Sequence, residues 1–322
     1  MFCEGAVVMG SRHRVTTSEA VLMTNVGRRY YLHGQSKNEI ADVLGISRFR
    51  VARLLERARE EGIVRIEVGL PGQQDAGLRL ELEQRFGLGR VVVLDVPDEG
   101  GRDLLRRLGR AAVELLGEVA TADDVIGLAS ARPLLGIRED VDAFPACTVV
   151  QLTGAVSRPD ALDIIQSIRD VTKVGGGEAY VYYAPIVGAA RADDLRRNPD
   201  VARAFAMVPR LTAAVLGVGA WAPGLSTVYD AVTDADRQQA AEVGVHAEIA
   251  GIYLDRDGVP MHPRIEQHTL APSFDELTRI PTRVGIAFGS GKASATRAGI
   301  VGGLLNSLIT HRSAAEELLA LP

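Results

Sequence analysis

The segment Gly285–Lys292 has the residue types from which an anion-binding site can be built. Its sequence, GIAFGSGK, places glycines and a serine directly before a lysine, and a helical pattern follows over Ala293–Leu305. A glycine-serine turn at the start of a helix offers backbone N–H groups and the positive end of the helix dipole. Gly289, Ser290 and Lys292 are therefore candidate anion ligands, and Lys292 is one of only three lysines against 33 arginines. The spacing is not that of a P-loop, and a tight packing turn is the alternative interpretation.

A second group of residues, near the N-terminus, has the local signals of paired short helices. Ser36 precedes Glu39 by three residues, which is a capping box, and the helix that follows ends at Gly45. Ser47 can then cap the next helix, which carries an apolar stripe and several arginines. This arrangement predicts two short helices joined by a tight glycine turn.

The spacing within these helices fits a helix-turn-helix. Counted from Lys37 as the first position, the fifth, ninth, fifteenth and eighteenth positions are Ala41, Gly45, Val51 and Leu54. The motif needs a small residue where the helices cross, a glycine in the turn and apolar residues that hold the second helix. From residue 28 to 59 there are eight basic and three acidic residues, which suits a phosphate backbone. Solvated arginines on an unrelated small domain are the alternative. The candidate DNA-binding residues are Ser36, Lys37, Ser47, Arg48, Phe49, Arg50, Arg53 and Arg57.

The chain after this module divides into a connector and a large domain. Residues Glu60–Ile66 predict a short strand or β-wing, and Gly69–Asp75 has the glycine and proline content of a linker. Residues 76–86 predict a helix that either packs on the large domain or makes a dimer contact. We expect a DNA-binding domain over 1–68, a linker and helix over 69–88, and an effector domain over 89–322.

The large domain alternates apolar β-rich runs with helical stretches such as Asp103–Ala120. This alternation predicts a doubly wound α/β fold with a largely parallel sheet. The expected strands are Arg90–Val96, Asp124–Leu128, Thr148–Leu152, Ala179–Tyr183, Ala213–Val218, His246–Leu254 and Arg283–Ala287.

Ligands bind such sheets at the carboxyl ends of the strands, so the loops after the strands are the places for an effector. Gly127–Leu134 and Gly217–Trp221 are rich in small residues. Glu248 is a carboxylate in an apolar run, either a buried acceptor of sugar hydroxyls or an outward-facing strand residue. The candidate effector-binding residues are Ser130, Ala131, Arg132, Thr153, Gly154, Gly217, Gly219, Glu248, Gly289, Ser290 and Lys292.

Catalytic and metal-binding patterns are poorly supported. The six histidines lack metal-ligand spacing, and neither Cys147 nor any serine lies in a nucleophile turn. We therefore expect no catalytic residue, no metal and no cofactor. Cys3 and Cys147 lie far apart in sequence, which suits a reducing compartment.

Composition and charge set broader bounds. The 322 residues are 47% hydrophobic and 24% charged, which excludes a disordered chain and a collagen-like repeat. No apolar run reaches the roughly 18 residues of a membrane span, and no signal-peptide layout is seen, so we expect a cytoplasmic protein. Residues 1–70 carry eleven basic and eight acidic residues within a chain of net charge −5. A basic N-terminal module on an acidic body favours nucleic-acid contact at one end.

Two stretches carry a resemblance to a known family. Residues 30–47, YYLHGQSKNEIADVLGIS, and 51–64, VARLLERAREEGIV, look like the winged helix-turn-helix of the SorC family of bacterial transcriptional regulators. Residues 283–304, with Gly289, Lys292 and Arg297, resemble the C-terminal sugar-binding signature of that family. The resemblance covers nearly the full length of the chain.

The resemblance implies a sugar-binding domain with the fold of sugar-phosphate isomerases and deaminases, in a homodimer or homotetramer on paired operator half-sites. In the family, a phosphate is held by the loops that match Gly289 with Lys292 and Ser130–Leu134. Relatives usually carry a Trp-Gly-Arg-Thr type of sequence in the second loop, of which only Arg132 remains here, and an aspartate at the position of Glu248. We therefore expect a DNA-binding regulator whose effector is a sugar, a sugar phosphate or a polyol. The alternative is an isomerase-like or deaminase-like enzyme fused to a DNA-binding module.

Overall fold

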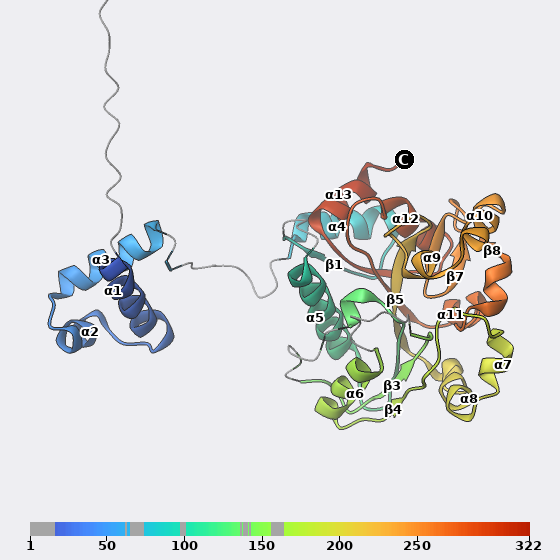
Figure 1. Ribbon diagram of the computed structural model, residues 1–322, viewed down its shortest axis with the longest axis horizontal. Helices are drawn as coiled ribbons and strands as arrows, with labels where there is room; N and C mark the ends of the chain where they lie inside the picture. The colour runs from blue at the N-terminus through green and yellow to red at the C-terminus, as the bar shows by residue number, and fades with distance from the viewer. Residues whose placement is uncertain are drawn as a thin grey trace, which may run out of the picture. The chain divides into compact units, whose positions relative to one another are not determined.

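The protein consists of two compact units, Met1–Gly69 and Leu70–Pro322, drawn in Figure 1. The computed structural model describes residues 17–61, 63–64, 74–96, 101–135, 137, 141, 143–155 and 164–322. Among these residues, no helix is both long and apolar enough to cross a membrane.

The N-terminal unit is helical. It contains α1 (Thr17–Gly27), a π-helical turn (Arg28–Leu32), α2 (Lys37–Leu44) and α3 (Arg48–Glu60). The buried core of this unit is formed by Met23, Val26, Ile40, Ala41, Val51, Leu54, Leu55 and Ala58. The apolar stripes of all three helices therefore meet in one small core, which holds α2 and α3 together.

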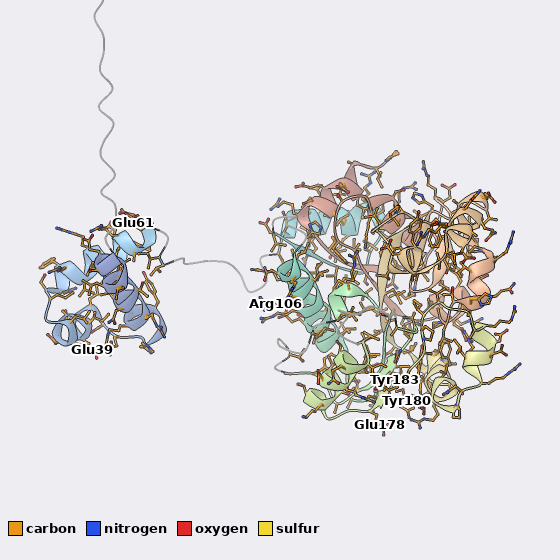
Figure 2. All side chains as sticks on the ribbon, in the orientation of Figure 1. Glu39, Glu61, Arg106, Glu178, Tyr180 and Tyr183 are labelled. Carbon is orange, nitrogen blue, oxygen red and sulfur yellow. The ribbon has the colours of Figure 1, made fainter. Side chains whose placement is uncertain are left out.

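Local capping sets the ends of α2 and α3. The Ser36 hydroxyl accepts a hydrogen bond from the backbone of Glu39, and the Glu39 carboxylate, labelled in Figure 2, accepts one from the backbone of Ser36. Gly45 ends α2 with a φ of +63°, a conformation that glycine adopts without strain. The capping box and the glycine stop are thus confirmed.

Parts of the expected connector lie outside the described residues. The predicted wing over Glu60–Ile66 includes Gly62, Arg65 and Ile66, which are not described, and α3 itself extends to Glu60. Most of the predicted linker Gly69–Asp75 is not described either. The helix expected over residues 76–86 is α4 (Ala76–Phe86), whose Leu82 is fully buried against the large unit.

The second unit has a mixed α/β fold around one sheet. Seven strands, all paired in parallel, follow the order β1-β10-β9-β5-β2-β3-β4, and β6, β7 and β8 extend from β5 in antiparallel pairing. The strands are β1 (Arg90–Leu94), β2 (Val125–Leu128), β3 (Thr148–Gln151), β4 (Ala179–Tyr180), β5 (Ala213–Ala220), β6 (Ala247–Ile249), β7 (Ile252–Leu254), β8 (Pro260–Met261), β9 (Thr282–Ile286) and β10 (Ser307–His311).

Helices cover both faces of the sheet. Successive residues of a strand point to opposite faces, and Val93 and Leu94 of β1 accordingly belong to two separate cores. One face is packed by α4, α8 (Pro199–Phe205), α11 (Phe274–Thr278), α12 (Ala293–Val301) and α13 (Arg312–Ala320). The other is packed by α5 (Arg102–Val119) and α6 (Ile164–Gly175). Short helices in the connections are η2 (Arg132–Leu134), α7 (Ala192–Arg196), η4 (Val208–Arg210), α9 (Thr227–Ala231), α10 (Asp234–Glu242) and η5 (Arg264–His268).

Three expected strands differ clearly from the structure. The strand expected over Ala179–Tyr183 is only the two residues of β4. The single strand expected over His246–Leu254 is a hairpin, β6 and β7, whose two-residue turn consists of Ala250 at φ +50° and Gly251 at φ +85°. Positive φ at both central residues is the geometry that joins twisted antiparallel strands. The strand expected to stop at Val218 continues to Ala220, because β6 pairs with its last residues. Two strands were not predicted from the sequence: β8, which pairs with β7, and β10, which lies between β1 and β9.

Candidate functional site

A cavity lies at the carboxyl ends of three neighbouring parallel strands, β2, β5 and β9. It is lined by residues 130–133 after β2, by 217–219 within β5, by Ile286 and Phe288 at the end of β9, and by Lys292. Glu248 reaches it from β6, which is hydrogen-bonded to β5. Residues from four loops and strands far apart in sequence therefore meet where parallel sheets bind ligands.

Seven of the predicted effector residues line this cavity. They are Ser130, Ala131, Arg132, Gly217, Gly219, Glu248 and Lys292. Nine further residues line the cavity and were not predicted: Pro133, Ile186, Val218, Leu225, Ser226, Thr227, Ala250, Ile286 and Phe288. These loops therefore surround one cavity, whereas effector binding by each residue stays a prediction.

Lys292 is a buried cation at the start of α12. Lys292 is only 3% exposed, and its Nζ donates a hydrogen bond to the carbonyl of Val218 at 2.8 Å. Burial, and to a smaller degree the positive charge of Arg132, lower the pKa of Lys292 to about 7, while the charge of Glu248 opposes the shift. Lys292 therefore changes its charge near neutral pH.

Glu248 is a buried carboxylate, so the outward-facing alternative is wrong. One oxygen, Oε2, accepts a hydrogen bond from the Ser226 hydroxyl at 2.8 Å, and the other, Oε1, accepts one from the Gly251 backbone at 2.7 Å. Burial raises the pKa of Glu248, against the effect of these two hydrogen bonds and of Lys292. The β6–β7 turn that supplies the Gly251 N–H thus holds the carboxylate in a fixed position.

Two cations lie near the Phe288 ring. Nζ of Lys292 is 4.3 Å from the ring centroid, and the guanidinium carbon of Arg132 is 4.9 Å from it. Such cation–π contacts keep positive charge beside an apolar surface. An NH group of Arg132 also donates to the carbonyl of Gly224 at 3.3 Å, which links the loop after β2 to the segment after β5.

The two glycines of β5 allow the surrounding loops to approach closely. A Cβ at Gly217 would lie 2.8 Å from the Cβ of Ala131, and a Cβ at Gly219 would lie 2.7 Å from the Cβ of Ser226. Both distances are shorter than nonbonded carbon atoms tolerate. Gly219 in particular leaves the space in which Ser226 reaches Glu248.

The other four predicted effector residues do not line this cavity. The Thr153 hydroxyl accepts a hydrogen bond from the Ser130 backbone at 2.8 Å, so Thr153 positions the loop after β2. The Gly154 N–H donates to Leu270, and that of Gly289 donates to Nε2 of His311. Ser290 is exposed. We expected the Gly289 N–H to be available to an anion, but in the structure it donates its hydrogen bond to His311.

Ser226 and Phe288 are two of the nine lining residues that were not predicted from the sequence, and both contact a predicted residue. Phe288 lies within the glycine-rich segment before Lys292, so its position was a usable signal. Ser226 contacts Glu248 across 22 positions of the chain, and nothing local in the sequence indicates that contact. Ser226 also caps α9, since its hydroxyl accepts a hydrogen bond from the Tyr229 backbone.

The cavity has a volume of about 30 Å³. That is room for roughly two water molecules, and it is smaller than a sugar. Within the described part of the chain, no group of three or more His, Cys, Asp or Glu side chains could hold a metal ion.

The predicted DNA-binding residues of the helical unit have different roles. Ser36 and Ser47 cap α2 and α3 through their hydroxyls. Arg57 forms an ion pair with Glu19 of α1 at 2.9 Å, so it ties α3 to α1.

The remaining candidates present side chains to solvent. Arg48, Phe49, Arg50 and Arg53 are exposed at the start of α3, whereas Lys37 is half-buried with its Nζ 5.8 Å from the centre of the Tyr30 ring. Among the described residues, none forms an ion pair with Arg48, Arg50 or Arg53. Their charges are thus available to phosphates or base edges.

Comparison with known proteins extends these observations. A family model described as "Putative sugar-binding domain" matches residues 72–320. The chain is 31% identical over 305 residues to the "Uncharacterized transcriptional regulator YjhU" of Escherichia coli strain K12, covering 90% of this chain and 92% of the relative. It is 28% identical over 320 residues to the transcriptional regulator LsrR of Klebsiella pneumoniae, covering 94% of each. The crystal structure of the full-length sorbitol operon regulator SorC from Klebsiella pneumoniae matches with a TM-score of 0.68 at 21% identity, over 94% of this chain and 100% of that chain.

The fold and these matches define the class of protein, a transcriptional regulator with a sugar-binding domain. The chain belongs to the family of SorC-type sugar-binding transcriptional regulators.

Proposed function

We propose that the N-terminal unit is a winged helix-turn-helix that binds double-stranded operator DNA, and that the α/β unit binds a sugar, sugar phosphate or polyol that modulates this binding. The observation that best supports this proposal is a cavity at the carboxyl edge of the sheet that buried Lys292 and Glu248 both line. The cavity lies within the region that matches the sugar-binding family. The same proposal includes the domain boundaries 1–68, 69–88 and 89–322 and a fold like that of sugar-phosphate isomerases. It also includes a cytoplasmic homodimer or homotetramer.

The chemistry of the cavity supports a polyhydroxylated ligand. Glu248 and Ser226 can exchange their mutual hydrogen bond for bonds to sugar hydroxyls, since a carboxylate oxygen accepts and a hydroxyl does both. Lys292 and Arg132 supply positive charge for a phosphate. The Phe288 ring offers an apolar face to the C–H groups of a sugar.

A thermal-shift screen of the purified chain tests the effector proposal. At a concentration one hundred times its dissociation constant, a ligand that binds only the folded state adds about 2.7 kcal/mol of stability. Stabilisation by phosphorylated sugars alone supports anchoring by Lys292 and Arg132. Stabilisation by free polyols alone indicates an effector held mainly by Glu248 and Ser226. No stabilisation by either class contradicts the proposal.

The DNA-binding proposal is tested with alanine variants of three arginines on α3. Arg53→Ala removes an exposed cation and should weaken operator binding strongly, as should Arg48→Ala. Arg57→Ala removes the ion pair with Glu19 and should have the smaller effect on DNA affinity. Fluorescence anisotropy with labelled duplex measures the DNA affinity of all three variants. Operator binding that survives Arg48→Ala and Arg53→Ala contradicts the assignment of α3 as the recognition helix.

We also propose that the α/β unit is not an enzyme. Both oxygens of Glu248 accept hydrogen bonds from the protein, so this carboxylate serves as a fixed hydrogen-bonding group and not as a free base. Incubation with sugar phosphates and product analysis tests this statement, and turnover that is lost in Glu248→Gln contradicts it.

A further inference from the structure

Phe49 is an exposed aromatic residue that the packing of the helical unit does not use. It is the second residue of α3 and is 85% exposed, the highest value among the large exposed apolar side chains of the described residues. It is absent from the core formed by α1, α2 and α3. The exposed ring therefore contributes no burial to the fold of this unit, and the side chains around it indicate what it could bind.

The surroundings of Phe49 indicate what that ligand is. Arg53 follows Phe49 by four positions, which places the two side chains on one face of α3. Arg48 and Arg50 flank Phe49 and are exposed as well. In contrast to Arg57, which is paired with Glu19, these arginines have no ion-pair partner among the described residues. An apolar ring within a positively charged surface suits a polyanion that also carries apolar groups.

The major groove of DNA offers such groups. The C5 methyl of thymine is the apolar feature that base pairs present there, and phenylalanine is one of the side chains that contact it. The first residues of a recognition helix are those that reach base edges, and Phe49 lies in that first turn. A phenyl ring has no hydrogen-bonding group with which to read a donor or acceptor.

We propose that Phe49 is a specificity-determining residue that packs against the methyl group of a thymine in the operator half-site, beside the bases or phosphates contacted by Arg53. This inference rests on the proposed function of the N-terminal unit and extends it to the kind of base pair that the unit selects.

The test begins with a duplex selected in vitro from a random pool by the full-length wild-type chain. Each thymine of that duplex is then replaced, one at a time, by deoxyuridine, which lacks the methyl and keeps the pairing. For the wild type, loss of one buried methyl should raise Kd about fourfold at one thymine per half-site. For Phe49→Ala, the same replacement should leave Kd unchanged.

Controls separate this contact from other effects. Val21→Ala removes an apolar side chain that is 63% exposed on α1 of the same unit, and this variant should keep the wild-type response to deoxyuridine. Thermal unfolding of Phe49→Ala should match the wild type, because the ring is exposed.

Three results overturn the inference. The first is a wild-type Kd that no deoxyuridine replacement changes, and the second is a Phe49→Ala variant that keeps the full deoxyuridine effect. The third is a Phe49→Ala variant that keeps the deoxyuridine response but dissociates into smaller species in sedimentation experiments. That result would make Phe49 a contact between copies of the chain. A wild-type chain that selects no DNA overturns the proposed function itself, and so differs from the other outcomes.

Discussion

At the scale of single residues, the central feature is a lysine and a glutamate that share one buried cavity. A buried charge is costly unless it is paired and hydrogen-bonded, and Lys292 and Glu248 each have hydrogen bonds to the protein. Keeping two ionisable groups in an α/β core adds little to folding stability. Their presence is consistent with ligand binding.

Replacing Lys292 by methionine should separate effector response from DNA binding. Lys292→Met keeps most of the length of the side chain and removes the cation that would hold an anionic effector. We expect operator affinity to stay within about twofold of the wild type while the effector no longer changes it. Anisotropy titrations with and without effector measure both quantities.

Lys173→Met is the matched control, because Lys173 is an exposed lysine on α6. It should behave as the wild type. A normal effector response in Lys292→Met would show that the anion is bound elsewhere.

The lowered pKa of Lys292 predicts two dependences on pH. In the folded state this pKa is about 7, whereas in the unfolded chain it returns to about 10.5. Between these values the unfolded state binds more protons, so stability contributed by this group rises with pH across that window. Affinity for an anionic effector should instead fall as pH rises through 7, because Lys292 loses its charge.

Both dependences can be measured by comparing the wild type with Lys292→Met. In denaturant melts between pH 7 and 10, the free energy of unfolding of the wild type should increase relative to that of Lys292→Met as pH rises. Calorimetric titration with the effector over pH 6 to 8 should show decreasing affinity for the wild type. A flat difference in the melts would contradict the buried-cation interpretation.

At the scale of elements, the end of β5 determines the shape of the cavity. Gly219→Ala would place a methyl group 2.7 Å from the Cβ of Ser226. Relief of that contact displaces Ser226 from Glu248, and overpacking of this kind costs about 1–3 kcal/mol. We expect a lower melting temperature and weaker effector binding.

Gly117→Ala provides the comparison. Gly117 lies within α5, and a Cβ there meets no heavy atom within 4 Å. Alanine in a helix is favoured over glycine by up to about 1 kcal/mol, so this variant should be at least as stable as the wild type. Equal stability of the two variants would contradict the crowding at Gly219.

At the scale of the whole molecule, the proposed function requires that effector and operator binding be coupled. A coupling free energy of 1–3 kcal/mol corresponds to a change in affinity of roughly 5- to 150-fold, and it is reciprocal. We therefore expect the effector to change operator affinity by the same factor as operator DNA changes effector affinity. Calorimetry and anisotropy on the full chain measure the two factors, and unequal factors would mean that the ligands act on different species.

The local features of this protein could be predicted from its sequence. Caps and turns such as Ser36 with Glu39, and Gly45, depend on neighbouring residues, so their signals are contained in a few consecutive positions. The parallel strands also have continuous apolar runs, which made most of them recognisable. The hairpin at Ala250 and Gly251 was missed, because an apolar run with one glycine looks like a single strand.

The sequence by itself determined the α/β class, the helical N-terminal unit and the loops that could form an effector site. Only the tertiary structure decided which residues of those loops meet. It joined Ser226 to Glu248, placed Phe288 beside Lys292 and Arg132, and engaged the Gly289 N–H with His311. The physical reason is that helix and strand formation depends on local spacing, whereas the contacts of Ser226 with Glu248 and of Gly289 with His311 depend on which strands lie side by side in the sheet.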